Sequence, residues 1–395
     1  MVAIEYRTYE ANQKSSNSTI LQQASKFMLS KIILYIVLYW SYKFLNNKSH
    51  RGYKLFLILA GMLLTAQSGL RNYAVGADTY QYYLMFEDVF TKSWTDIFQA
   101  FTNYYQYGVG KDPGYDLLMK VFQIVFPDFR CFLIAIAAFY FAGMLKLFHK
   151  YKLDMKSVLI SIALYQALFY SFFSITGIRQ TIAAAVTLWV IPAAVERKFW
   201  KFLIPILIVS TIHKSALLFI PFYLFGYIKN PKLAIIGALI LFVPMWIGGQ
   251  GFVQLLIADT IFNQYEDYLE GYDTQGALTF ALFIILVAFT LLMKFKKLEH
   301  KVGFRIFACA IAFAVFYTPM TSVGPSQMRI VQYYSILLLI MLPWLIKNIG
   351  NNKYSNAVLL FFVCYSLYND PPYAFFWQDM NLGANYQFSK IISGW

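Results

Sequence analysis

The stretch that decides the fold covers residues 158–195 and reads VLISIALYQALFYSFFSITGIRQTIAAAVTLWVIPAAV. Its only charged side chain is Arg179. As one helix it would be about 57 Å long at about 1.5 Å per residue, roughly twice the hydrocarbon core of a bilayer. The sequence therefore predicts two helices with a break at residues 174–177, where Thr176 caps the returning helix and Gly177 makes the turn.

Apolar segments of this kind recur along the whole chain. Of its 395 residues, 59% are hydrophobic and only 13% are charged, which is typical of an integral membrane protein. We predict an all-α fold, a polytopic bundle of about twelve membrane-spanning helices. The predicted spans are residues 31–45, 53–70, 129–148, 158–173, 180–195, 199–212, 215–228, 233–247, 277–293, 306–320, 330–346 and 354–368.

The predicted domain organisation is simple. Residues 28–395 form a single transmembrane domain, and residues 1–27, which are polar and contain the run YEANQKSSNST, form a disordered extension. The three cysteines show no Cys-x-x-Cys spacing, and no second metal ligand accompanies His213. We expect neither a metal nor a cofactor.

The net charge of +14 is distributed as a topology signal rather than as a nucleic-acid surface. Alternate connections are rich in Lys and Arg, which places them in the cytoplasm, and both termini then lie outside. Two outer connections are long, residues 71–128 and 248–276. The first contains GYDLLMKVFQIVF at 114–126, which predicts a short interfacial or re-entrant helix. The Tyr and Trp residues of this face fit either a membrane-interface belt or platforms that stack on sugars.

Arg179 is predicted to lie in the first turn of a helix that begins at the outer face. A helix N-terminus already carries about half a positive charge, so an arginine there indicates an anion beside it. The alternative is an arginine that extends to the membrane interface without a ligand. The same arrangement is predicted for His213 and Lys214, with Ser215 as the cap of the next helix.

Two further cations share this predicted location. Arg329 follows Ser326, a candidate helix cap, and Arg71 follows the end of a helix on the same face. Together, arginine side chains and helix N-termini suit a phosphate or diphosphate. Asp78 and Asp112 are predicted to supply acids near these cations, either as their ion-pair partners or as functional carboxylates.

His213 is the only histidine predicted on the outer face. An imidazole titrates near neutral pH, so His213 is a candidate to take a proton from a hydroxyl group. A transporter would also need charges within a membrane, although near the midplane or on both faces. A membrane acyltransferase and a structural scaffold are further alternatives, and they account less well for charges gathered on one face.

Five motifs in a fixed order carry a resemblance to a known family. They are RNYAVGADTYQYY (71–83), DPGYDLLMKVF (112–122), TGIRQTIAAAV (176–186), IHKSALLFIPFY (212–223) and PSQMRIVQYY (325–334). In these motifs the chain resembles EpsG-type, Wzy-like polysaccharide polymerases from about residue 28 to its C-terminal aromatic segment. It departs from them at Asp112, where the family more often has Glu before Pro-Gly, and in its long N-terminal extension.

The resemblance implies a multi-pass enzyme of the bacterial cytoplasmic (inner) membrane with a GT-C-like architecture. Such enzymes join oligosaccharide repeat units carried on undecaprenyl diphosphate at the outer face, making O-antigen, capsule or exopolysaccharide without a metal or a nucleotide sugar. The implied partners are the lipid-linked glycan, the bilayer, a chain-length regulator and a flippase. A flippase or exporter of lipid-linked sugars is the alternative function.

The implied chemistry gives each candidate residue a role. The expected catalytic residues are Arg179 at the diphosphate, His213 as general base, and Asp78, which orients an arginine or competes as the base. The expected substrate-binding residues are Arg71, Arg329, Lys214, Asp112 and Tyr80.

Overall fold

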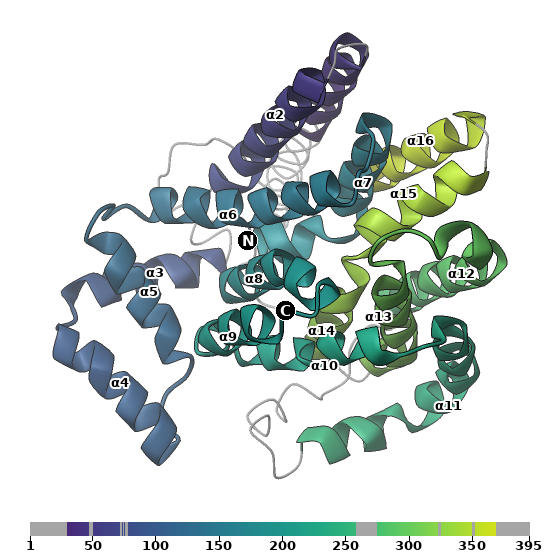
Figure 1. The fold of residues 1–395 in the computed structure, drawn as a ribbon. Coiled ribbons are helices and arrows are strands. Elements are labelled where there is room, and N and C mark those ends of the chain that lie inside the picture. The colour runs from purple at the N-terminus through teal and green to yellow at the C-terminus, as the bar shows by residue number, and fades with distance from the viewer. Residues whose placement is uncertain are drawn as a thin grey trace, which may run out of the picture. The chain divides into compact units, whose positions relative to one another are not determined.

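The computed structural model describes residues 30–46, 50–71, 73, 75, 78–257, 275–322, 325–349 and 352–368. Helices make up this part of the chain, with no β-strand in it, which confirms the all-α prediction (Figure 1). The extension at residues 1–27 lies outside the described residues, and the single domain at 28–395 stays a prediction.

The elements follow one another as short and long helices. After a helix at residues 30–45 come α2 (His50–Gly69), α3 (Thr79–Thr91), α4 (Trp94–Tyr107), α5 (Pro113–Gln123), α6 (Phe129–Lys150), α7 (Met155–Leu168), the π-helical turn η1 (Ser171–Ile175), α8 (Ile178–Val195), α9 (Phe199–Ser210), the 3-10 helix η2 (Lys214–Phe219), α10 (Pro221–Leu224), η3 (Phe225–Tyr227), α11 (Pro231–Ile257), α12 (Gln275–Leu298), α13 (Phe304–Tyr317), η5 (Thr318–Ser322), α14 (Pro325–Ser335), α15 (Leu338–Ile349) and α16 (Asn352–Tyr368).

Five helices in the described part are long and apolar enough to cross a membrane. They lie at Phe129–Lys150, Ile178–Val195, Pro231–Gly249, Leu278–Leu298 and Phe304–Ser322, and a pair bent by 47°, Gln327–Ser335 with Leu338–Ile349, makes a possible sixth. The predicted count of about twelve spans and the GT-C-like arrangement are not confirmed. Several predicted spans form shorter helices, such as α9 with 12 residues and α7 with 14.

One predicted span is wrong. Residues 215–228 do not form one helix but three short pieces, η2, α10 and η3. Pro221 lies in the middle of this segment and begins α10. Proline has no N–H to donate, and its ring clashes with the carbonyl four residues earlier, so a continuous helix through Pro221 is disfavoured.

The break inside residues 158–195 is confirmed at the predicted place. Gly177 has a φ of +65°, which favours glycine, and its carbonyl accepts the Thr181 N–H at 2.9 Å. Gly177 therefore occupies the cap position of α8. The prediction that Thr176 caps this helix is wrong, because the Thr176 hydroxyl donates to the Ser171 carbonyl at 2.9 Å and closes the π-helical turn instead.

The connection at residues 71–128, predicted to lie at the outer face, contains three helices, of which the sequence predicted only α5. α4 begins with a capping box, in which the Ser93 hydroxyl accepts the Asp96 N–H at 3.1 Å and the Asp96 carboxylate accepts the Ser93 N–H at 2.9 Å. It ends at Gly108, whose φ is +67°. Of the second connection predicted to lie at the outer face, residues 248–276, the structure describes only the end of α11 and the start of α12.

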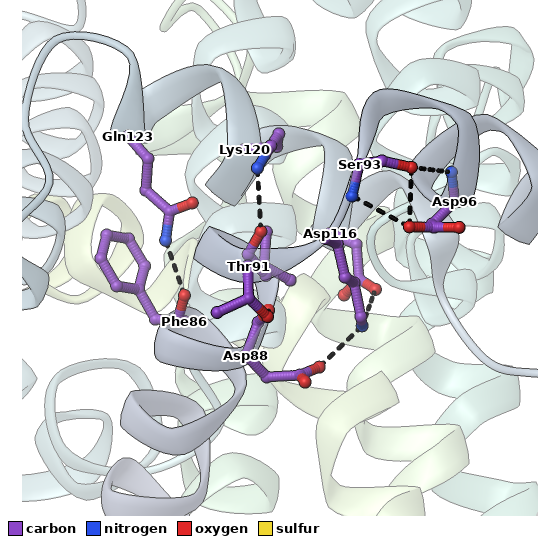
Figure 2. A network of polar contacts seen from close by, with 10 residues as sticks. Phe86, Asp88, Thr91, Ser93, Asp96, Asp116, Lys120 and Gln123 are labelled. Carbon is purple, nitrogen blue, oxygen red and sulfur yellow. Dashed lines mark hydrogen bonds and ion pairs between the residues drawn. The ribbon is translucent and has the colours of Figure 1, made fainter.

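Polar contacts join α5 to α3 and to Lys92 (Figure 2). Lys92, which follows α3, pairs with Asp116 of α5 at 3.3 Å. Lys120 donates to the Phe90 carbonyl at 3.0 Å, and Gln123 donates to the Phe86 carbonyl at 2.6 Å. The bond from Lys120 satisfies a carbonyl in the last turn of α3, and the three contacts together fix α5 against α3.

The chain divides into two compact units. Of the described residues, unit 1 takes those within Met1–Leu145, Ala163–Thr181 and Leu359–Trp395, and unit 2 takes those within Lys146–Ile162 and Ile182–Val358. The turn between α7 and α8 belongs to unit 1. In the same unit, Lys31 of the first helix donates to the Ser366 carbonyl of α16 at 2.8 Å.

At Gly69, two residues before Arg71, α2 lies very close to the backbone of α6. A Cβ at residue 69 would meet the Ile134 Cα at 2.7 Å, so the helices must separate. We expect Gly69→Ala to lower the free energy of unfolding by about 1–3 kcal/mol, measured as a lower Tm in detergent. The control is Gly237→Ala, where no atom lies within 4 Å of the added Cβ. Equal Tm values for the two variants would contradict this close approach.

Candidate functional site

Arg179 lies at the start of α8 in an ion pair with a buried carboxylate. Its Nη1 is 2.6 Å from Asp112 Oδ2, and the two side chains are 19% and 1% exposed. Nε donates to the Tyr82 hydroxyl at 3.3 Å. The guanidinium also lies over the rings of Tyr82 and Tyr115, 5.6 and 6.0 Å from their centroids. Arg179 is therefore fixed by α3 and α5.

Asp112 reaches Arg179 from an unusual backbone conformation. Its φ of 51° and ψ of 55° lie in the left-handed region, which few residues other than glycine adopt. Pro113 follows as the first residue of α5, and the Asp112 carbonyl accepts the Tyr115 N–H at 2.9 Å. The ion pair with Arg179 offsets the strain of this conformation.

Arg71 is a second buried guanidinium in unit 1, only 4% exposed. Its Nη1 donates to the Ser68 carbonyl at 2.7 Å, and Nε has no hydrogen-bond partner among the described residues. Burial lowers the pKa of Arg71 to about 10, and the neighbouring phenol groups of Tyr170, Tyr165 and Tyr115 oppose this. The side chain therefore remains cationic at neutral pH.

Tyr115 links the two arginines. Its side chain is fully buried, and within the described part of the chain its hydroxyl has no hydrogen-bond partner. Burial raises the pKa of Tyr115 well above its usual value, while Arg179 and Arg71 oppose this as nearby cations. We call Arg71, Tyr82, Asp112, Tyr115 and Arg179 the Arg179 cluster. Its two guanidiniums and one carboxylate leave a net positive charge, which attracts an anion.

The sequence did not identify Tyr82 or Tyr115 as members of this cluster. Both lie in the motifs already quoted, Tyr82 in YQYY and Tyr115 directly after DPG. A tyrosine three residues after the cap of a short helix points back toward the cap. The spacing of three residues between Asp112 and Tyr115 is therefore the pattern from which Tyr115 could have been predicted.

Asp78 and Tyr80 lie at the start of α3. The Asp78 carbonyl accepts the Tyr82 N–H at 3.0 Å, and its side chain makes no capping hydrogen bond. Among the described residues no contact joins Asp78 to Arg71 or Arg179. The Tyr80 ring packs against Tyr83 at 5.9 Å. Their predicted roles stay predictions.

The other predicted residues, His213, Lys214 and Arg329, belong to unit 2. His213 is 5% exposed and precedes η2, with its N–H donating to the Val209 carbonyl at 2.9 Å. Arg329 is half-buried near the start of α14, a helix that packs on η2. The structure thus places His213, Lys214 and Arg329 close to helix starts, as predicted.

The predicted caps of these helices are wrong. The residue before η2 is His213, so Ser215 lies inside that 3-10 helix, and its hydroxyl bonds to the Tyr333 hydroxyl at 2.9 Å. α14 begins at Pro325, which places Ser326 within the helix. Proline suits a first helical position because its missing N–H would be unpaired there. Groups of three or more His, Cys, Asp or Glu side chains suited to a metal do not occur in the described part.

Comparison with known proteins gives one family. The model described as EpsG family matches residues 54–388, most of the chain. No curated protein matches, and no solved structure matches.

The ion pair gives a stability prediction. Asp112→Asn keeps the size of the side chain but leaves the Arg179 guanidinium without its counter-ion, which costs about 3 kcal/mol or more. We expect a clearly lower Tm in detergent. The control is Asp116→Asn, whose partly exposed pair with Lys92 contributes about 0–1 kcal/mol. A Tm for Asp112→Asn no lower than that of the control would show that the pair does not stabilise the fold.

Proposed function

We propose a specific polymerase reaction for this chain, which belongs to the EpsG family and is a membrane protein of the polysaccharide-polymerase type. It joins oligosaccharide repeat units carried on undecaprenyl diphosphate into a surface polysaccharide. The reaction takes place at the outer face of the bacterial cytoplasmic membrane. The chain acts as a glycosyltransferase with a lipid-diphosphate-linked donor.

The observation that carries this proposal is the position of Arg179. Asp112 engages Nη1 and the Tyr82 hydroxyl engages Nε, which leaves Nη2 for a ligand. The first four N–H groups of a helix have no partner within the helix, so the start of α8 adds donors beside the guanidinium. Arg71 supplies a second cation within the same unit. A diphosphate has the charge and the oxygen acceptors that match these donors.

The chemistry requires stabilisation of a leaving group. The bond between the anomeric carbon and a diphosphate oxygen breaks, and its electron pair remains on the diphosphate. A hydroxyl oxygen of the acceptor unit bonds to the anomeric carbon and loses its proton. Negative charge therefore develops on the diphosphate in the transition state, where a fixed guanidinium such as Arg179 stabilises it.

Other residues have supporting roles in the proposal. Asp112 positions Arg179, and Arg71, Arg329, Lys214 and Tyr80 bind the diphosphate or glycan. His213 takes the proton of the acceptor hydroxyl, with Asp78 as the competing candidate. Each role is proposed for its residue separately. The partners are the lipid-linked glycan and the bilayer, with a chain-length regulator and a flippase as further candidates.

Arg179 gives the first test. Purified protein is incubated with a lipid-diphosphate-linked repeat unit, and the products are separated on a gel. Wild type should give a ladder, and Arg179→Ala should lower its rate about 100-fold or more. The control is Arg130→Ala, because Arg130 is also the second residue of a helix, α6, but stacks on Tyr73 without a buried carboxylate partner.

The outcomes separate the candidate functions. A normal ladder with Arg179→Ala would remove Arg179 from the reaction. If wild-type protein gives no ladder with its native lipid-linked unit but moves that unit across a bilayer, the chain is a flippase or exporter.

His213 gives an independent test. Loss of a general base lowers a rate about 100-fold or more, so we expect His213→Ala to abolish most of the ladder while the protein still reaches the membrane. The control is His300→Ala, an exposed histidine after α12. An unchanged rate for His213→Ala would transfer the base role to Asp78, for which Asp78→Asn is then measured.

Metal independence is tested in the same assay. We expect the ladder to persist in excess EDTA, because the proposed stabilisation of the leaving group comes from guanidinium groups. A loss of activity that Mg²⁺ or Mn²⁺ restores would contradict this part of the proposal.

A further inference from the structure

α4 carries an aromatic face that the proposed reaction does not use. Trp94, Phe98, Phe101 and Tyr105 recur at intervals of three or four residues, so they form one line along the helix. Three of them are largely exposed, Trp94 by 42%, Phe98 by 58% and Tyr105 by 62%. Their rings stack in pairs, Trp94 with Phe98 at 6.3 Å and Phe101 with Tyr105 at 6.5 Å. We call these four residues the aromatic face.

The side of α4 next to the aromatic face is polar but uncharged. Its residues are hydroxyl and amide side chains: Thr95, Gln99, Thr102, Asn103 and Gln106. Gln99 donates to Asn103 at 3.1 Å, so the amides already form an ordered row. Asp96, the one charged residue of the helix, is used by the capping box. We call this side the polar flank.

The helix is held rigidly in unit 1. Ile97 is fully buried on the side opposite the polar flank, and α4 packs on α5. The capping box and Gly108 fix its two ends, and Lys92, just before the cap, is tied to α5 by Asp116 (Figure 2). A ligand of the aromatic face therefore meets an ordered surface, which lowers the entropic cost of binding.

The aromatic face is about 16 Å long, at about 1.5 Å per residue from Trp94 to Tyr105. A short segment, residues 108–111, connects the end of α4 to Asp112 of the Arg179 cluster. Partial burial and the Asp112 carboxylate raise the pKa of Tyr105. The chain between α4 and α5 ends at Asp112 itself.

We propose that the aromatic face and the polar flank form a binding subsite for the glycan of the lipid-linked substrate. Sugar rings stack their apolar C–H faces on aromatic rings, and their hydroxyl groups exchange hydrogen bonds with amides and hydroxyls. The subsite takes the saccharide whose diphosphate binds at Arg179, and to that extent it rests on the proposed function. A membrane-surface helix typically carries Lys or Arg on its polar side. α4 has neither, which favours a glycan over a lipid surface.

The direct test is binding of glycan without lipid. The probe is a set of oligosaccharides of one to several repeat units, released by mild acid from the surface polysaccharide of the source organism. Binding to the full chain in lipid nanodiscs is measured by calorimetry. We expect Trp94→Ala and Phe98→Ala to weaken binding about tenfold or more. The control is Trp200→Ala, a tryptophan of α9 that is 66% exposed.

The variant Arg179→Ala distinguishes glycan binding at this subsite from the proposed polymerase reaction. Because the probe has no diphosphate, Arg179→Ala should bind it as wild type does while losing the ladder. In the polymerase assay, Trp94→Ala and Phe98→Ala should give shorter products. Glycan binding that depends on Trp94 supports the subsite even if no ladder forms. Wild-type binding by both aromatic variants, alongside a normal ladder, overturns the subsite and leaves the polymerase standing.

A second measurement identifies lipid as the alternative occupant. In a background with Cys131 and Cys364 replaced by Ser, Phe98→Cys should react with a water-soluble maleimide, and the oligosaccharides should protect it. Absence of labelling, together with quenching of Trp94 fluorescence by brominated lipids, would place the aromatic face in the bilayer and overturn the proposal.

Discussion

The ion pair between Arg179 and Asp112 is the constraint on which the described part of unit 1 depends. A buried carboxylate that loses its cation is strongly unfavourable, and an arginine at a helix N-terminus is unfavourable without an anion. The ion pair removes both unfavourable situations, because Arg179 supplies the cation for Asp112 and Asp112 supplies the anion for Arg179. The pair joins the start of α8 to the start of α5, 67 residues apart in the sequence. Through α5 it fixes the connection at residues 71–128 against the turn between α7 and α8.

The same pair leaves the arginine available for chemistry. Two of its nitrogen atoms have protein partners, which orients the guanidinium plane, and the third faces no described partner. Lysine would give a point charge at this place, whereas the planar guanidinium can hold Asp112 with one nitrogen atom and present another to the proposed phosphate ligand. Arg71, buried in the same unit, leaves a net positive charge after Asp112 has neutralised one cation. A carboxylate beside Arg179 is therefore compatible with the proposed anion site.

α3, α4 and α5 show how a long connection becomes ordered. Their ends are fixed by a capping box, a left-handed glycine and bonds from lysine and glutamine to backbone carbonyls. This local chemistry adds to the packing of buried rings such as Phe86 and Tyr115 against Phe132 of α6. The order brings an aromatic face and a cationic cluster into one unit, and these match the two parts of a glycosyl diphosphate, its sugar rings and its phosphates.

The sequence by itself determined the all-α class, the break within residues 158–195 and the place of Arg179 at a helix start. The low content of charged residues indicates the all-α membrane class. The length of the apolar segment and Gly177 indicate the break, and with it the place of Arg179. All of these are local properties of the sequence. The motif order also indicated the family. The caps predicted at Thr176 and Ser215 are wrong because the cap position depends on which residue begins the helix. The helix predicted at residues 215–228 is wrong because Pro221 interrupts it. Only the tertiary structure decided that Asp112, rather than Asp78, pairs with Arg179 and that Tyr82 and Tyr115 enclose it. Contacts between residues so far apart in the chain, and a left-handed conformation at an aspartate, depend on packing that no single segment encodes.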